Sequence, residues 1–469
     1  MANSNPFDNT EGTFLVLVND ESRHSLWPAS FDIPTGWTVA HPADNHAACV
    51  HYVDTHWTDS GRAASWPRPS GPREARGSAA LAGARDAPRE PSPISITSML
   101  DGIRPHTPTS LRDVCTQRLE RVAAALQLGA PTRDLVGVFR SMTAGWGGAP
   151  PEDLPASDVS ADGSPVEVAI DLDDADPAVQ VAVEAVAPGD APADRTAAAR
   201  ALMARLVRTH AADEAAWSAV ADLFLPAQPA GEHVAMFGAE LGKSGATRFK
   251  VWFYLDVAGA GAALDLLADG LAQLGLGTTW PAVVRHMARG ASVDVPFLLS
   301  LDLLDDSAAR TKIYFRHYDT SAERLAAQLA SYPGFHPGSV AAFCRLMTGD
   351  AADFAEQPPV TSLSFVSSAP RVPGATTLYV PLWTCAPNDA VVQARVRQLL
   401  ATQHRSSERY DCALAGMAGR PLDHARGIHN YISWRPAAPW PRMKIYWSPE
   451  LRAPNPPPRY RLASADVAC

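Results

Sequence analysis

The sequence predicts an α+β protein of two unequal parts: a small N-terminal domain and a large domain in which units of strands and helices repeat around a closed barrel. Three observations lead to this prediction. The composition changes sharply near residue 60, strand-like segments recur at nearly constant intervals in the longer part, and these segments carry cationic and aromatic residues on one face. A chain of 469 residues is long enough for two or three domains.

The overall composition narrows the class of protein. Apolar residues make up 46% of the chain, which allows a large core, yet no apolar run is long enough to span a membrane. The N-terminus lacks the basic and apolar stretches of a signal peptide, so we expect a cytoplasmic protein. The net charge of −10 argues against nucleic-acid binding. The six cysteines form no pair or cluster with zinc spacing, so we expect no metal at these positions.

A segment dense in Pro, Ser, Gly, Arg and Ala separates the two parts. It contains almost no large apolar residues, so it cannot bury enough surface to fold. The sequence therefore predicts a domain at 1–62, a disordered linker at 63–93 and a second domain at 94–469.

The first domain begins with a predicted strand at 12–19 and continues through turn-rich sequence with several tryptophans. Its motifs are Asn5-Pro6-Phe7, Asn19-Asp20-Glu21, Ser25-Leu26-Trp27-Pro28, Pro34-Thr35-Gly36-Trp37 and Trp57-Thr58-Asp59. In this order and spacing they resemble the MbtH-like proteins over roughly residues 5–62. Two departures are Arg23-His24 before the Ser-Leu-Trp-Pro stretch and a displaced Arg62, and neither changes Trp27 or Trp37.

This resemblance implies a binding module and not an enzyme. Members of that family bind adenylation domains of nonribosomal peptide synthetases, and the resemblance places the contact at Ser25, Leu26, Trp27 and Trp37. The residues themselves agree in part. A unit of this size has too little core to bury all of its tryptophans, and exposed tryptophans beside prolines are good interface anchors.

The second domain begins with two predicted helices, at 110–128 and 132–145, and a strand follows at 165–171. Related strands recur at intervals of about 62 to 67 residues, with helical stretches such as 321–332 and 387–404 between them. These related strands are predicted at 248–254, 310–315, 376–380 and 442–447. The interval predicts five units, each with two strands and one or two helices.

Side chains alternate along these strands. Lys250 and Trp252 share a face, while Val251 and Phe253 share the other. The same pattern recurs in Arg310-Thr311-Lys312-Ile313-Tyr314 and in Arg442-Met443-Lys444-Ile445-Tyr446. The apolar faces should pack under the helices. The cationic and aromatic faces could be the plain surface of an open sheet, but the lumen of a closed barrel explains a face with charge of one sign better.

Cations gathered in one lumen repel one another and favour an anionic ligand, and a diphosphate suits both Arg and Lys donors. Aromatic faces stabilise a carbocation by about 0.5–2 kcal/mol per ring and exclude the water that would quench it. The pattern therefore indicates ionisation of an allylic diphosphate.

Several short motifs now indicate a family. Lys250-Val251-Trp252, Arg310-Thr311-Lys312-Ile313-Tyr314, Tyr379, the pair Tyr431 and Tyr446, and Gly163-Ser164-Pro165-Val166-Glu167 resemble the dimethylallyltryptophan synthase-type prenyltransferases over about residues 95–454. The resemblance implies an antiparallel ten-stranded barrel ringed by helices, the ABBA or PT barrel. It also implies metal-independent transfer of a prenyl group, with dimethylallyl diphosphate as the best candidate donor, to an electron-rich aromatic acceptor such as an indole.

The resemblance also assigns roles to residues. Glu167 would orient the acceptor and remove its proton, and we expect the lumen cations to keep it ionised. The predicted diphosphate ligands are Lys250, Arg310, Lys312, Tyr314, Tyr379, Lys444 and Tyr446. The predicted cation shield and acceptor pocket comprise Trp252, Tyr254, Tyr314, Tyr379, Tyr431 and Tyr446.

The sequence departs from the family pattern at four places. Trp252 replaces a usual tyrosine, and Thr377 replaces a common glutamine. Gln180 stands where an arginine often binds phosphate, so Lys444 or Arg442 is expected to substitute. Phe237 stands where some members have an acid–base lysine, which puts attack from indole C4 in doubt.

Other functions stay open at this stage. Magnesium-dependent prenyl transfer needs an aspartate-rich helix, and the candidates Asp173-Asp174-Ala175-Asp176 and Asp305-Asp306 are better explained as loops or helix caps. Alternatively, the barrel is inactive and the chain is a scaffold that recruits a synthetase. The acceptor could be tryptophan, a tryptophan-containing peptide or a tyrosine-type ring, and the fusion favours an amino acid or a nonribosomal peptide.

Overall fold

The computed structural model describes residues 13–19, 24–29, 33, 37–56, 110–172, 177–187, 189, 191–259, 261–305, 309–349, 354–366, 371–438 and 440–454. The chain divides into two compact units, Met1–Ile94 and Ser95–Cys469. The linker predicted at 63–93 lies outside the described residues. Each unit is therefore considered by itself.

The N-terminal unit is a three-stranded antiparallel sheet with one helix. The central strand is β1 (Thr13–Asn19), flanked by β2 (His24–Pro28) and β3 (Trp37–Asn45), and α1 (His46–His56) follows β3 directly. Phe14 and Val16 of β1 are buried against Cys49 of α1 and form a small core. The strand predicted at 12–19 is β1.

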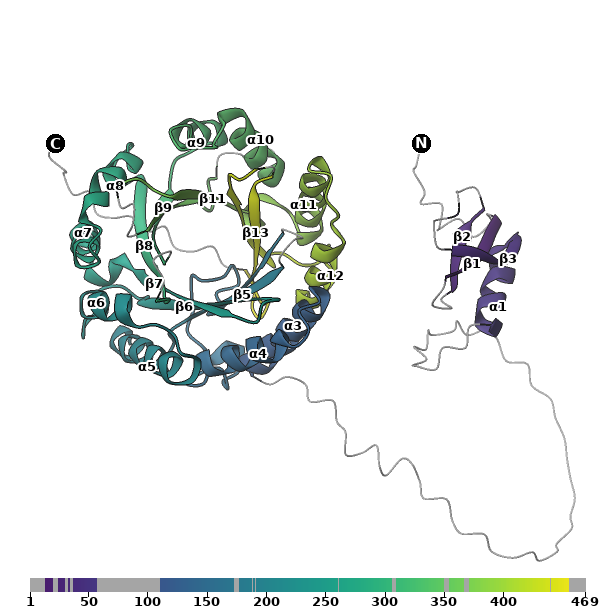
Figure 1. The fold of residues 1–469 in the computed structure, drawn as a ribbon, viewed down its shortest axis with the longest axis horizontal. Helices are drawn as coiled ribbons and strands as arrows, with labels where there is room; N and C mark the ends of the chain where they lie inside the picture. The colour runs from purple at the N-terminus through teal and green to yellow at the C-terminus, as the bar shows by residue number, and fades with distance from the viewer. Residues whose placement is uncertain are drawn as a thin grey trace, which may run out of the picture. The chain divides into compact units, whose positions relative to one another are not determined.

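The second unit is a closed barrel of ten antiparallel strands, as expected (Figure 1). Each strand pairs with its neighbours along the chain, and β13 pairs with β4 to close the circle. The strands are β4 (Val166–Asp171), β5 (Ala178–Glu184), β6 (Ala235–Gly242), β7 (Thr247–Tyr254), β8 (Asp294–Asp302), β9 (Arg310–His317), β10 (Val360–Val366), β11 (Ala375–Pro381), β12 (His429–Arg435) and β13 (Arg442–Trp447).

Pairs of helices surround the barrel. The helices are α3 (Leu111–Ala125), α4 (Pro131–Met142), α5 (Pro192–His210), α6 (Ala215–Phe224), α7 (Ala263–Gln273), α8 (Trp280–His286), α9 (Ala322–Leu329), α10 (Pro337–Thr348), α11 (Asp389–Thr402) and α12 (Glu408–Met417). A pair follows each of the first four hairpins, whereas α3 and α4 precede β4. Since α3 packs against α12 and α4 contacts α5, these first helices close the ring between the last and the first of the other pairs (Figure 1).

The alternation along the strands positions the site. Phe249, Val251 and Phe253 of β7 are buried on the outer face of the barrel, where the Phe253 ring lies 5.3 Å from Trp217 and 5.1 Å from Phe224 between ring centroids. The residues between them, Lys250 and Trp252, line the interior. The prediction that the apolar face packs under helices is therefore confirmed for this strand. None of the described helices is both long enough and apolar enough to cross a membrane.

Candidate active site

The barrel encloses a cavity of about 630 Å³. The inward-facing side chains of the strands line it, together with residues of the segments before β4, β6 and β10. Every lumen residue that the sequence singled out lies on this cavity: Glu167, Lys250, Trp252, Tyr254, Arg310, Lys312, Tyr314, Tyr379, Tyr431, Lys444 and Tyr446.

Strand register divides the cavity into two ends and a middle. On β4, Glu167 and Asp171 are separated by roughly 13 Å, since a strand rises about 3.3 Å per residue. Lys444 pairs with Asp171 in register, so it lies at the Asp171 end. Tyr446 pairs with Ala169 in the middle. The cavity therefore has a cationic end, an aromatic middle and a second polar end around Glu167.

Glu240 of β6 lies at the centre of the cationic end. Its Oε2 atom accepts hydrogen bonds from Lys250 Nζ at 3.1 Å and from Lys444 Nζ at 2.5 Å, and its Oε1 atom accepts one from Arg248. Burial would raise the pKa of Glu240, but the charges of Lys444 and Lys250 outweigh it and hold that pKa far below its ordinary value. Glu240 is therefore ionised.

The two cations of β9 differ in their partners. The guanidinium of Arg310 donates to Asp302 Oδ2 at 2.7 Å. Lys312 has no hydrogen bond or ion pair among the described residues. Burial, together with the charges of Lys250 and Arg310, holds the pKa of Lys312 well below its ordinary value. An anion that contacts this lysine would therefore raise its pKa.

The carboxylates correct one expectation from the sequence. We expected the charge of the lumen face to have one sign, with only a ligand to offset it. In the structure Glu240 of β6, Asp302 of β8 and Asp171 of β4 already pair with lumen cations, because these strands are neighbours of the strands that carry Lys250, Arg310 and Lys444. The missed signal was the spacing of Met236, Gly238 and Glu240, which places all three on one face of a strand.

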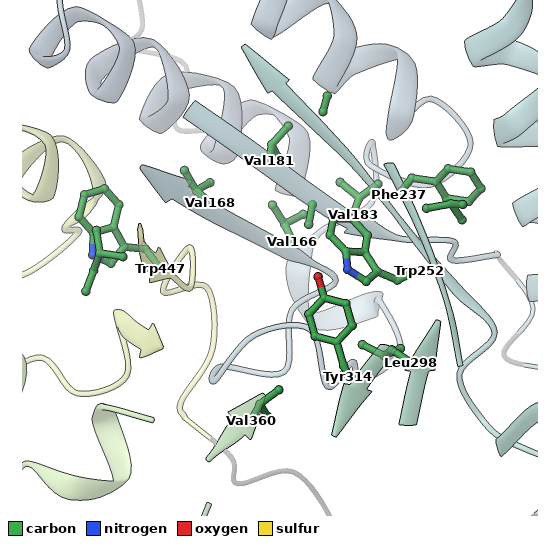
Figure 2. Close-up of a cluster of buried hydrophobic side chains, with 14 of the residues drawn as sticks. Val166, Val168, Val181, Val183, Phe237, Trp252, Leu298, Tyr314, Val360 and Trp447 are labelled. Carbon is green, nitrogen blue, oxygen red and sulfur yellow. The ribbon is translucent and has the colours of Figure 1, made fainter. Parts of the chain in front are cut away.

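Aromatic rings form the middle of the cavity. The rings of Tyr314 and Tyr379 lie 5.9 Å apart between centroids, as do those of Tyr379 and Tyr446. Figure 2 shows Trp252 beside Tyr314. The indole has room because a Cβ at Gly238 would come within 2.6 Å of its ring. The absence of a side chain at Gly238 thus allows tryptophan at position 252.

Glu167 lies at the opposite end from most of the cations. Asn430 Nδ2 donates to its Oε1 atom at 2.7 Å. Burial raises the pKa of Glu167 to about 8, and the charge of Asp158 adds to this effect, while the Asn430 hydrogen bond opposes it. The expectation that lumen lysines and arginines keep Glu167 ionised is therefore wrong, since the cations with which it was grouped lie at the other end. With a pKa of about 8, Glu167 is largely protonated at neutral pH.

A second charged group faces the Glu167 end. Asp158 accepts a hydrogen bond from Arg316 Nη2 at 2.8 Å and another from the Tyr254 hydroxyl. Burial would raise the pKa of Asp158, but His233 and Arg316 lower it below its ordinary value. The sequence predicts Tyr254 in the acceptor pocket, whereas its motifs do not indicate Asp158 or Arg316. A signal for Arg316 was present, because it continues the alternation of Arg310, Lys312 and Tyr314.

His233 also lines this end, and a buried carboxylate supports it. Its Nδ1 atom donates to Glu184 Oε1 at 2.8 Å, and Arg195 Nη1 donates to the same oxygen at 2.7 Å. Burial lowers the pKa of His233, but Asp158 and Glu184 reverse this and raise it to about 9. Positive and negative groups therefore coexist at the Glu167 end.

Comparisons with known sequences agree with this geometry. The sequence pattern of the family described as tryptophan dimethylallyltransferase matches residues 147–329, and that of the family described as MbtH-like protein matches residues 3–70. The chain joins an MbtH-like domain to a barrel of the tryptophan dimethylallyltransferase family. The enterobactin biosynthesis protein YbdZ of Escherichia coli strain K12 is 39% identical over 57 residues, which are 12% of this chain and 79% of that protein.

Solved structures resemble the dimethylallyltransferase barrel over nearly their whole length. PriB, bound to L-tryptophan and dimethylallyl thiolodiphosphate, is 26% identical with a TM-score of 0.67, covering 75% of this chain and 99% of that one. The 6-dimethylallyltryptophan synthase of Micromonospora olivasterospora, in complex with DMASPP and tryptophan, is 25% identical with a TM-score of 0.67, covering 74% and 99%. The 5-dimethylallyltryptophan synthase of Streptomyces coelicolor, at 24% identity and a TM-score of 0.66 over 74% and 99%, shares the fold.

The two acidic segments that were candidates for a metal site lie largely outside the described residues. Residues 173–176 and Asp306 lie outside the described residues, and Asp305 is exposed. Within the described ranges no three His, Cys, Asp or Glu side chains gather closely enough to hold a metal ion.

The structure describes only part of the contact surface that was predicted for the MbtH-like domain. Ser25, Leu26 and Trp27 form the middle of β2, but their side chains lie outside the described residues. Trp37 begins β3, pairs in register with Asn19 and is half-buried. Trp57 is not among the described residues.

Proposed function

We propose that the barrel transfers a dimethylallyl group from dimethylallyl diphosphate to the indole of tryptophan or of a tryptophan-containing peptide. The observation that carries the proposal is the order of groups along one cavity: cations, then aromatic rings, then a buried carboxylate. This order fits a substrate with an anionic head, an allylic carbon and an aromatic acceptor in line.

The cationic end binds the diphosphate, and Lys250, Arg310, Lys312 and Lys444 are its proposed ligands. Heterolysis of the C1–O bond leaves both electrons on the diphosphate and creates an allyl cation. Charge-assisted hydrogen bonds from these ligands stabilise the leaving group. The Tyr314, Tyr379 and Tyr446 rings surround the cation with electron-rich faces, joined by Trp252 and Tyr431.

The acceptor ring supplies the electron pair for the new C–C or C–N bond. Glu167 then takes the displaced proton. A carboxylate whose pKa is raised to about 8 by burial is a stronger base than an ordinary glutamate, so it is suited to this step once it is ionised. Tyr254 lies beside this position through its hydrogen bond to Asp158.

The charged groups around Asp158 support an amino-acid acceptor. Asp158 is positioned for an ammonium group, while Arg316 and His233 are positioned for a carboxylate. The amide oxygen of Gln357, which also lines the cavity, has no hydrogen-bond partner within the described structure. It is therefore available to an N–H of the acceptor.

A direct test combines the full chain with dimethylallyl diphosphate or geranyl diphosphate and a panel of acceptors, followed by mass spectrometry. The panel contains L-tryptophan, tryptophan-containing cyclic dipeptides and L-tyrosine. We expect the mass of one dimethylallyl group on a tryptophan acceptor, with and without EDTA. Failure of every acceptor, despite a folded barrel, would favour the inactive scaffold. Loss of activity in EDTA that magnesium restores would contradict metal-independent transfer.

We propose further that the MbtH-like domain binds the adenylation domain of a nonribosomal peptide synthetase through Ser25, Leu26, Trp27 and Trp37. The half-buried Trp37 supports this proposal, because partly exposed tryptophans are frequent anchors of protein interfaces. The fusion then brings prenyl transfer and amino-acid activation to one place.

A further inference from the structure

One buried carboxylate connects cations from distant parts of the barrel wall. Glu240 belongs to β6, and Lys250 belongs to the neighbouring strand β7. Lys444 belongs to β13, which β4 and β5 separate from β6. Both ammonium groups nevertheless donate to the same Oε2 atom, at 3.1 and 2.5 Å, and the Glu240 side chain is only 6% exposed. Glu240 therefore fixes where these two lysines meet.

Counting hydrogen-bond donors shows what remains for a ligand. An ammonium group has three N–H donors. Lys250 gives one to Glu240 and one to Gln180 Oε1 at 3.3 Å. Lys444 gives one to Glu240 and contacts Asp171 Oδ2 at 3.4 Å. Each lysine thus retains one N–H, and both line the cavity.

We propose that Glu240 is a positioning residue for diphosphate binding. It holds Lys250 and Lys444 as a protonated pair and leaves one N–H of each for a phosphate oxygen. This inference rests on the proposed function of the barrel. Glu240 touches neither the acceptor nor the reacting carbon in this arrangement, and it acts through the two lysines.

The charges around Lys250 and Lys444 explain why these two lysines need Glu240 to stay protonated. Burial lowers the pKa of Lys250, and Lys444 lowers it further, whereas Glu240 raises it. Lys312, without a carboxylate contact, has a pKa well below the ordinary value. Removing the charge of Glu240 should therefore release a proton from the pair at a lower pH. The charged or titratable groups near the two lysines are Glu240, Asp171, Asp302, Arg248, Arg310 and Lys312.

The test measures binding of inorganic diphosphate to the full chain by calorimetry between pH 6 and 9, for wild type and Glu240→Gln. At pH 6 the variant should bind as tightly as wild type or more tightly, because a repulsive charge is gone. As the pH rises its affinity should fall earlier, with a midpoint lower by about one pH unit and a binding constant about tenfold weaker at pH 9.

Asp302→Asn is the matched control. It removes the same charge from the same end of the cavity, but the partner of Asp302 is Arg310, whose guanidinium keeps its proton throughout this range. Asp302 also raises the pKa of Lys250, but less than Glu240 does, so the pH midpoint of Asp302→Asn should fall by less than that of Glu240→Gln. Glu240→Asp retains the charge but shortens the side chain, so it should keep the wild-type midpoint and bind diphosphate more weakly at every pH.

Two results would overturn the inference. In the first, Glu240→Gln binds diphosphate more tightly than wild type at all pH values, so that Glu240 only repels the ligand. In the second, its pH midpoint equals that of wild type. If Glu240→Gln fails to fold, wild-type affinity in Glu240→Asp would overturn the positioning role instead. Absence of diphosphate binding by wild type would count against the proposed function itself.

Discussion

Two buried glutamates in the same cavity have opposite ionisation. Glu240 is surrounded by Arg248, Lys250 and Lys444, and its pKa lies far below the ordinary value despite its burial. Glu167 has Asn430 and Asp158 beside it, and burial raises its pKa to about 8. Burial is common to both, so the neighbouring charges decide the difference. The barrel thus separates a permanent anion that organises cations from a carboxyl group that can exchange a proton.

The largest effect should come from the Glu167 end. Glu167→Gln keeps one acceptor oxygen for the Asn430 amide but cannot take a proton. Proton transfer by a positioned group contributes roughly 10²–10⁴-fold to a rate, so turnover should fall by about that range while prenyl diphosphate still binds. Steady-state kinetics together with calorimetry would separate the two effects. Wild-type turnover in this variant would exclude Glu167 as the base.

The next effect concerns the cationic end. Lys312→Ala and Arg310→Ala should each weaken binding of prenyl diphosphate by about 1.5–3 kcal/mol, the loss of one charge-assisted contact. The loss should be clear for Lys312, which has no carboxylate to compete with the ligand among the described residues. Calorimetric titration with a non-reactive thiolodiphosphate analogue would measure it. Unchanged affinity in both folded variants would mean that these cations do not contact the diphosphate.

A smaller effect should appear in the pH dependence of the free energy of unfolding. The pKa of Glu167 is raised in the folded chain, so the stability that it contributes is present at acidic pH and is lost as the pH rises towards 8. Glu167→Gln carries no charge and escapes this loss. Its free energy of unfolding relative to wild type should therefore increase by at most about 1.4 kcal/mol per pH unit over this range.

Thermal unfolding at pH 5.5 and pH 9 would measure the difference. We expect the melting temperature of Glu167→Gln to exceed that of wild type by more at pH 9 than at pH 5.5. An equal difference at both values would indicate that Glu167 titrates normally.

Sequence patterns predicted the strands that alternate in polarity. Segments such as 248–254 and 442–447 place charged and apolar residues on opposite faces, and the structure has strands there. Strands β8 and β10 were not predicted individually. Their segments, such as Asp294–Asp302, are buried along nearly their whole length, and a short apolar run does not distinguish a strand from a helix by periodicity.

The strands that were not predicted also explain what was missed in the site. Asp302 lies on β8 and Glu240 on β6, neither of which was recognised as a strand, so the partners of the cations went unseen. The ionisation of Glu167 was mispredicted for a different reason. A shared inward face does not give the position along the barrel axis, and that position depends on which strands are neighbours and on their register.

The smallest effect on prenyl transfer should follow removal of the MbtH-like domain. The chain forms two compact units, and every described residue that lines the cavity belongs to the second. A shortened chain that begins at Ser92 should therefore keep kcat and KM within about twofold of the full chain, provided that the intervening segment acts as a flexible connection. Loss of prenyl transfer by a shortened chain with an intact barrel would show that the two domains are coupled.

The isolated MbtH-like domain should bind an adenylation domain without the barrel. A fragment of residues 1–65 should retain the small core of Phe14, Val16 and Cys49, and with it the β-sheet that carries the predicted contact residues. We expect it to co-purify with an adenylation domain and Trp37→Ala to weaken that association, since tryptophan is among the residues that contribute most to interfaces. Glu167→Gln in the full chain should leave the association unchanged, because it alters only the barrel. Equal binding by the Trp37→Ala fragment would remove Trp37 from the contact, and failure of both the fragment and the full chain to bind would contradict the proposed partner.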